Sequence, residues 1–171
     1  FFNVDLRDDK TYPWIKLTIR EDFPRMLWTR RKVRDGSLYF GPYPKVTLTR
    51  ALIRYLFRSR IITLRPCAFE FSIAKPLAQK KIQGCLHYHT RECPAPCAGR
   101  ISPAAYRALA ERAALFLEGQ YSRLEKGLTS EMLKASKALQ YERAGEFRDS
   151  LKGLRHMKEW VRVRAVAGKG D

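Results

Sequence analysis

Four cysteines, Cys67, Cys85, Cys93 and Cys97, form the clearest chemical pattern in this 171-residue chain. Intervals of 17, 7 and 3 residues separate them, and prolines lie among them. Structural zinc sites usually pair cysteines with two to four residues between them, a spacing that only Cys93 and Cys97 have. One close and two wide intervals favour a [4Fe–4S] cluster, in which each iron takes one thiolate. On spacing alone, zinc and a metal-free segment stay as alternatives.

The cysteine-rich segment also contains His87 and His89, which could replace a thiolate in a zinc site. Four cysteines already suffice, so we expect both histidines to be ordinary polar residues near the site. Full thiolate ligation leaves no open position, which predicts a structural or redox-responsive site that does not activate water. Nearby cations are expected to lower the pKa of the thiols and to offset the charge of a ligated site. They are Arg65, Lys80, Lys81, Arg91 and Arg100.

The chain is strongly basic, with 34 Lys and Arg against 17 Asp and Glu and a formal charge of +17. Such a surplus costs self-repulsion in the folded state and usually serves a polyanionic partner. A solvated basic surface without a partner is the alternative. Contacts to phosphates are independent of base sequence, and Tyr39 and Tyr43 lie among the candidate cations. The candidate DNA-binding residues are Lys10, Lys16, Arg30, Arg31, Lys32 and Arg34.

Composition indicates a folded protein, since hydrophobic residues make up 45% of the chain and aromatic residues 12%. No apolar run approaches the roughly 20 residues that cross a bilayer. The opening residues, Phe1 to Asp5, lack the order of a signal peptide. We therefore expect a cytoplasmic protein with reduced cysteines. The abrupt start without Met suggests a piece of a longer chain.

An α+β fold is predicted, with a small antiparallel sheet and a helix in the N-terminal part. Alternating apolar residues predict a strand at 14–19, and 26–31 and 37–40 read as two more. Asp35-Gly36 predicts a hairpin turn between the second and third strands. A helix is expected over 47–58, with Thr47 as its N-cap.

The C-terminal part is predicted to be entirely helical. Ser102 followed by Pro103 marks a helix start, and this helix should end near Gly119. Two further helices are expected at 121–139 and 142–163. Because so few residues separate them, they must form an antiparallel hairpin. Two helices alone bury too little surface, so the hairpin needs a third surface from its own domain or another chain.

Short motifs in one order along nearly the whole chain resemble the UvrC family of bacterial excinuclease subunits. The N-terminal ones are Arg-Asp-Asp-Lys-Thr-Tyr-Pro (7–13), Glu-Asp-Phe-Pro-Arg (21–25), Thr-Arg-Arg (29–31), Asp-Gly (35–36) and Tyr-Phe-Gly-Pro-Tyr-Pro (39–44). They are followed by Arg-Glu-Cys-Pro-Ala-Pro-Cys-Ala-Gly (91–99) and Phe-Leu-Glu-Gly (116–119). Tyr-Glu-Arg-Ala (141–144) and Phe-Arg-Asp (147–149) are similar to the family's UVR hairpin.

This resemblance implies the middle of a nucleotide excision repair subunit that, with UvrB, cuts a damaged strand on both sides of a lesion. It implies a [4Fe–4S] cluster on the four cysteines, and UvrB and damaged double-stranded DNA as partners. The family's GIY-YIG and ribonuclease-H-like nuclease centres have no counterpart in these residues. We therefore expect no catalysis by this chain alone, although the parent protein would be an endonuclease subunit.

The resemblance also divides the chain into segments: 1–9, the end of the GIY-YIG domain; 10–66, an α/β scaffold; 67–100, the cysteine-rich metal-binding segment; 101–119, a linking helix; 120–164, the UVR hairpin; and 165–171, a flexible tail. In the hairpin, Phe147 and Leu151 are expected to be apolar anchors for UvrB. Gly145 stands where the family usually has Ala, which should loosen the helix. The full set of predicted UvrB-binding residues is Met132, Leu139, Tyr141, Glu142, Ala144, Phe147, Arg148, Asp149, Leu151 and Leu154.

Two alternatives from other classes fit the same residues. One is a zinc-containing adaptor that recruits a partner through the hairpin. The other is an RNA-binding accessory protein with the same partner-binding hairpin. The metal bound distinguishes the first, and a preference for structured RNA over damaged duplex distinguishes the second.

Overall fold

The computed structural model describes residues 12–43, 45–77 and 84–167, with side chains as far as Glu159. Lys10, Lys80, Lys81 and the predicted nuclease-domain end at 1–9 lie outside the described residues. The described part is α+β, with three short strands and five α-helices. Within it, no helix combines the length and the apolar character needed to cross a lipid bilayer.

The three strands are β1 (Trp14–Leu17), β2 (Met26–Thr29) and β3 (Leu38–Phe40). Their order is β2-β1-β3, and both outer strands run antiparallel to β1. The predicted hairpin between the second and third strands is therefore wrong. The central strand β1 carries the fully buried Ile15 and Leu17.

Residues 30–37 form a crossover loop over the outer face of the sheet. The loop must run along β1, because β2 ends at one end of β1 and β3 begins at the other. Alternation along the strand places Trp14 and Lys16 on the face away from the core. Lys32 lies 3.6 Å from the centre of the Trp14 ring, and Lys16 forms an ion pair with Asp35. These contacts hold the loop against the sheet.

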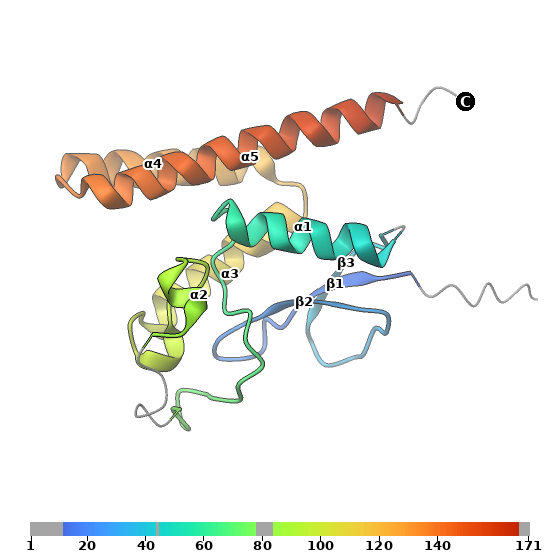
Figure 1. The fold of residues 1–171 in the computed structure, drawn as a ribbon, viewed down its shortest axis with the longest axis horizontal. Helices are drawn as coiled ribbons and strands as arrows, with labels where there is room; N and C mark the ends of the chain where they lie inside the picture. Colours follow the sequence, from blue (N-terminus) through green and yellow to red (C-terminus); the bar gives the residue numbers. More distant parts are fainter. Residues whose placement is uncertain (1–11, 44, 78–83, 168–171) are drawn as a thin grey trace, which may run out of the picture.

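Helix α1 (Val46–Arg58) covers the core face of the sheet, and Figure 1 shows it between the sheet and the C-terminal helices. The predicted N-cap at Thr47 is wrong, since α1 begins at Val46 and Lys45 precedes it without a side-chain cap. Thr49 instead donates its hydroxyl to the Lys45 carbonyl and is fully buried.

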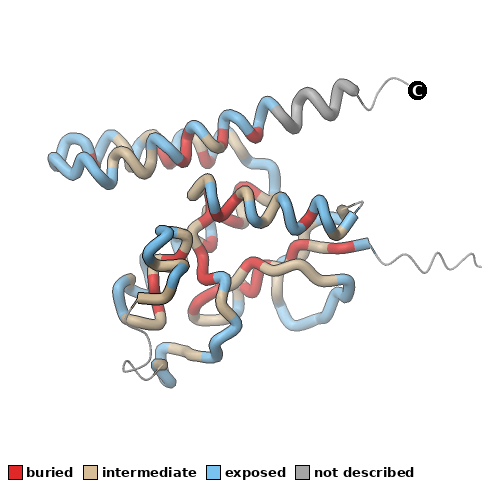
Figure 2. The backbone as a smooth tube through the Cα atoms, viewed as in Figure 1, coloured by how far each residue is buried: buried red, intermediate tan, exposed pale blue. Residues whose placement is uncertain are grey.

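The segment after α1 is irregular yet buried, as the red stretch beside α1 in Figure 2 indicates. Ile62 and Leu64 lie in the core, and the following Arg65 is 3% exposed. The Arg65 backbone N–H donates to the Tyr106 hydroxyl at 2.8 Å, and that hydroxyl donates to the Pro24 carbonyl at 2.9 Å. One tyrosine therefore satisfies two backbone groups of segments that have no regular structure.

Helix α3 (Pro103–Leu117) supplies this tyrosine. Its predicted start is confirmed, because the Ser102 hydroxyl accepts the Ala105 N–H as an N-cap. Tyr106, Ala113 and Phe116 face the core from α3, and the helix ends shortly before Gly119, whose φ of +76° suits a glycine.

Helices α4 (Tyr121–Lys137) and α5 (Tyr141–Ala167) form the predicted antiparallel hairpin and lie side by side in Figure 1. Its third surface comes from its own chain. The Tyr55 hydroxyl of α1 donates to the Gly153 carbonyl at 3.4 Å, and the Ser150 hydroxyl lies 2.9 Å from the Arg60 carbonyl oxygen. Leu151 and Leu154 of α5 belong to the same hydrophobic core as β1.

Replacing Tyr106 with Phe should lower the free energy of unfolding by about 1–3 kcal/mol, because the Arg65 N–H and the Pro24 carbonyl lose their partner while buried. Urea unfolding would measure the loss. Tyr141→Phe is the matched control, since Tyr141 is exposed. Equal stability of the two variants would contradict this role of Tyr106.

Three glycines of the hairpin provide a test of its packing against the segment that follows α1. A methyl group added at Gly153 would lie 3.0 Å from Ser59 Cβ, whereas one added at Gly127 meets nothing within 4 Å and one at Gly145 only the Arg148 guanidinium, at 3.9 Å. Gly127→Ala and Gly145→Ala should each stabilise the chain by about 0.5–1 kcal/mol. Gly153→Ala should give none of this gain in thermal unfolding. Three equal gains would show that α5 does not pack closely against Ser59.

Candidate functional site

The four cysteines line one small cavity although they come from separate places in the chain. Cys67 lies in the irregular segment, Cys85 precedes the short helix α2 (Leu86–His89), and Cys97 lies in the 3-10 helix η2 (Pro96–Ala98). With Cys93 they border a cavity of about 190 Å³. Its other lining residues are mostly apolar and include Pro66, Phe69, Phe71 and Pro96.

Tight local turns hold this arrangement. The His87 carbonyl accepts the N–H groups of Glu92 and Cys93, which returns the chain towards α2. Ala95 has a left-handed backbone with φ of 52°, so the chain reverses between Cys93 and Cys97. The prolines on each side of Ala95 restrict the turn further. Short-range backbone geometry therefore positions the close cysteine pair.

The thiols lie in a weakly polar environment. Burial, with a smaller contribution from the three neighbouring thiols, raises the pKa of Cys93 to about 12. Burial also raises the pKa of Cys97. The prediction that nearby cations lower the thiol pKa values is therefore wrong for these two cysteines. Arg91 pairs with Glu146 and Arg100 donates to the Tyr88 hydroxyl, so both guanidinium groups have other partners.

Four cysteines and one histidine border this cavity. All four cysteines are free thiols. His87 borders the cavity, but its Nδ1 lies 2.9 Å from the Glu92 carboxylate. Among the described residues no group of three or more Cys, His, Asp or Glu side chains is arranged as a metal-ion site. The cavity therefore brings four thiols together without defining a metal.

The predicted hairpin residues fall into two groups. Leu151 and Leu154 are buried in the chain's own core, and Met132 and Phe147 pack partly against it. Ala144 is half-buried. Glu142, Arg148 and Asp149 are exposed, and the last two pair with each other.

The large apolar residues of the hairpin that are exposed lie in the second half of α4 and at the connection to α5. Leu139 is 70% exposed, Tyr141 68% and Leu133 53%. Leu139 has a φ of 59°, so its backbone makes the sharp reversal between the two helices. Leu133 is not among the predicted residues, because it lies outside the 3–4 spacing of the buried stripe. Its departure from that spacing is the signal that could have identified it.

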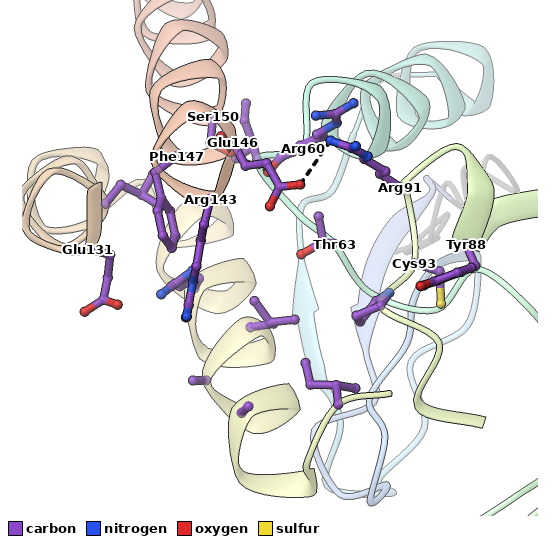
Figure 3. A pocket seen from close by; sticks show the side chains of 18 residues that line it. Arg60, Thr63, Tyr88, Arg91, Cys93, Glu131, Arg143, Glu146, Phe147 and Ser150 are labelled. Atoms are coloured by element: carbon purple, nitrogen blue, oxygen red, sulfur yellow. Dashed lines mark hydrogen bonds and ion pairs between the residues drawn. The ribbon is translucent and has the colours of Figure 1, made fainter. Parts of the chain in front are cut away.

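A second cavity of about 610 Å³ joins the cysteine-rich segment to the hairpin (Figure 3). Across it, Arg91 donates to the Glu146 carboxylate of α5 at 3.3 Å. The guanidinium groups of Arg112 and Arg143 lie 5.6 and 5.9 Å from the centre of the Phe147 ring. Burial, with the nearby Arg143, lowers the pKa of Arg112. Phe147, predicted as a partner anchor, therefore already contacts two cations of its own chain.

The predicted DNA-binding residues within the described part gather around the crossover loop. Arg30, Arg31 and Arg34 are exposed. Lys16 of β1 pairs with Asp35 of the loop, and Lys32 of the loop lies over the Trp14 ring of β1. Lys16 and the Ser37 N–H hold the pKa of Asp35 well below its usual range. The role of Asp35 was not predicted, because it depends on a crossover that the local sequence does not indicate.

Comparison with known proteins places the chain in a family. Residues 12–116 match the UvrC/Cho excinuclease middle domain, and residues 123–156 match the UvrB/UvrC motif. No solved structure matches the chain.

Three curated relatives carry the name UvrABC system protein C. The protein of Caldanaerobacter subterraneus subsp. tengcongensis is 39% identical over 96% of this chain and 26% of its own length. The protein of Desulforudis audaxviator is 39% identical over 90% of this chain and 24% of its own length. The protein of Gemmatimonas aurantiaca is 40% identical over 99% of this chain and 26% of its own length. The chain thus spans about a quarter of the length of these relatives. With the middle domain followed by the UvrB/UvrC motif, it belongs to the UvrC excinuclease family.

Proposed function

We propose that this chain is the central part of a nucleotide excision repair incision subunit. In that role it contributes DNA contact, a structural [4Fe–4S] cluster and docking of UvrB. The observation that carries the proposal is the succession of the two matched regions in a chain that follows its relatives over 90–99% of its length. Incision of damaged DNA is proposed for the whole protein, within which these residues position partners.

Docking of UvrB is proposed at the end of the hairpin. Leu139 and Tyr141 belong to the predicted docking residues and are both apolar and exposed. Leu133, on α4, is also apolar and exposed. A partner helix pair can bury such residues against its own apolar stripe. Leu151 and Leu154 would then support the hairpin from within the core and would not touch UvrB.

Replacing Leu139 and Tyr141 together with Ser should weaken binding of UvrB at least about 100-fold, since each lost apolar contact costs about 1.5 kcal/mol or more. Isothermal titration of the chain with UvrB would measure the change. Val33→Ser removes an exposed apolar side chain from the crossover loop and serves as control. Unchanged affinity of the double variant would rule out docking at this end.

The four-cysteine cavity is the proposed cluster site. Cys67, Cys85, Cys93 and Cys97 would each ligate one iron, and the apolar lining would exclude water. A bound cluster would supply iron–thiolate bonds to a segment with little regular structure. Such bonds can replace the hydrophobic core that this segment is too irregular to build.

Purification without oxygen should yield a brown protein with about four irons and four sulfides per chain. Cys97→Ser should lower the iron content, whereas Thr90→Ala, a change at an exposed residue of the same segment, should leave it intact. Elemental analysis and the visible spectrum would measure both. One zinc per colourless chain would contradict the cluster and favour a zinc-containing adaptor.

DNA contact is proposed at the crossover loop. Arg30, Arg31 and Arg34 are exposed there on a loop that two contacts to the sheet hold in place. A loop that is already fixed loses less conformational entropy when it binds a ligand, so its guanidinium groups are preorganised for binding phosphates. Contacts to phosphates carry no base preference, as damage at any sequence requires.

A further inference from the structure

Helix α1 carries three arginines, Arg50, Arg54 and Arg58, at intervals of four residues. All three are exposed. With a rise of 1.5 Å per residue they span about 12 Å along one face of the helix. Thr49 and Leu56 are buried in the core on the opposite face, so the arginine face stays on the surface.

This face lacks compensating charge. Helix α1 contains no Asp or Glu, and none of its three arginines forms an ion pair with a described residue. Like charges four residues apart on a helix repel by about 0.2–0.5 kcal/mol per pair. Only Arg58, in the last turn, gains from the partial negative charge of the helix end. The arrangement therefore disfavours the isolated fold slightly and suits an anionic ligand.

One of the three guanidinium groups is already oriented. That of Arg50 lies 4.7 Å from the centre of the Trp28 ring on β2. Trp28 pairs with Ile15 of β1, so its ring lies on the core face of the sheet. The crossover loop lies over the other face. The α1 arginines and the loop arginines are thus two separate cationic surfaces on opposite sides of one sheet.

The surface of α1 continues onto α5 of the hairpin. His156 of α5 lies with its ring centre 6.4 Å from that of Tyr55 on α1. Lys152, one helical turn before His156, is exposed. The cationic surface is therefore wider than one helix, which suits an extended ligand more than a single small anion.

We propose that Arg50, Arg54 and Arg58 form a second DNA-backbone contact, distinct from the crossover loop. The ligand is the phosphate backbone of duplex DNA, because arginine forks bind phosphate oxygens and the regular spacing matches a repeated anion. Binding is independent of base sequence. The inference rests on the proposed DNA contact of this chain and adds a site to it.

The test is binding of a fluorescent DNA duplex to the 171-residue chain across salt concentrations, measured by anisotropy. A variant with Arg50→Gln, Arg54→Gln and Arg58→Gln is compared with a variant of equal charge on α4, Arg123→Gln, Lys126→Gln and Lys137→Gln. The control residues are exposed and have no ion pair with a described residue. Loss of the Arg50 contact with Trp28 could disturb the fold of the triple variant. A double variant, Arg54→Gln with Arg58→Gln, keeps this contact and therefore controls for misfolding.

Loss of three duplex phosphate contacts should reduce the steepness of log affinity against log salt by about 2.7. The ratio of the affinity of the unchanged chain to that of the triple α1 variant should therefore fall roughly 40-fold between about 50 and 200 mM salt. The double variant should show about two thirds of this change in slope. The control variant should keep the slope of the unchanged chain.

Equal slopes for the α1 and control variants would overturn the inference, since diffuse charge would then explain binding. If Arg30→Gln with Arg31→Gln weakens duplex binding and the triple α1 variant does not, the second site on α1 is ruled out and the DNA contact at the crossover loop stands. If the unchanged chain binds no duplex at all, the proposed DNA contact fails together with the inference.

Discussion

The buried guanidinium group of Arg65 lies where the turn after β1, the cysteine-rich segment and α3 meet. It donates to the carbonyls of Phe23 and Phe69 and pairs with Glu21 at 2.9 Å, while its face lies 4.5 Å from the centre of the Phe71 ring. Burying a cation costs free energy unless it is paired and hydrogen-bonded. Separating Arg65 from Glu21 and the two carbonyls would therefore be strongly unfavourable. Irregular backbone is thereby fixed where neither helix nor sheet could fix it.

The cysteine cavity and the helical hairpin both depend on this junction around Arg65. Cys67, the first of the four cysteines, lies two residues after Arg65, and Arg65 itself borders the cysteine cavity. On its other side the buried segment 61–64 supports α5, because Gly153 packs closely against Ser59 and Ile61. The hairpin is therefore held by the same core as the sheet, whereas Leu139 and Tyr141 at its far end are exposed. The cationic surfaces lie outside this core, on α1 and on the crossover loop.

Local patterns predicted the helices well, because capping and apolar spacing act over a few residues. Ser102 before Pro103 and the short connection near Leu139 are examples. The sheet order was not predictable from the Asp35-Gly36 pair, because a turn signal does not say which strands it joins. The four cysteines line one cavity, but the raised pKa values of Cys93 and Cys97 depend on burial that charge counting ignores. Likewise, Leu151 reads as a docking residue in the sequence, since an apolar stripe does not reveal what covers it.

Native-state hydrogen exchange at the Arg65 amide tests most directly whether the junction holds the fold together. This N–H donates to the buried Tyr106 hydroxyl although its segment has no regular structure. If the account is right, the amide exchanges only on global unfolding, with the same opening free energy as the Ala110 and Ala113 amides of α3. Exchange by a low-energy local opening, as expected for an ordinary loop, would contradict it.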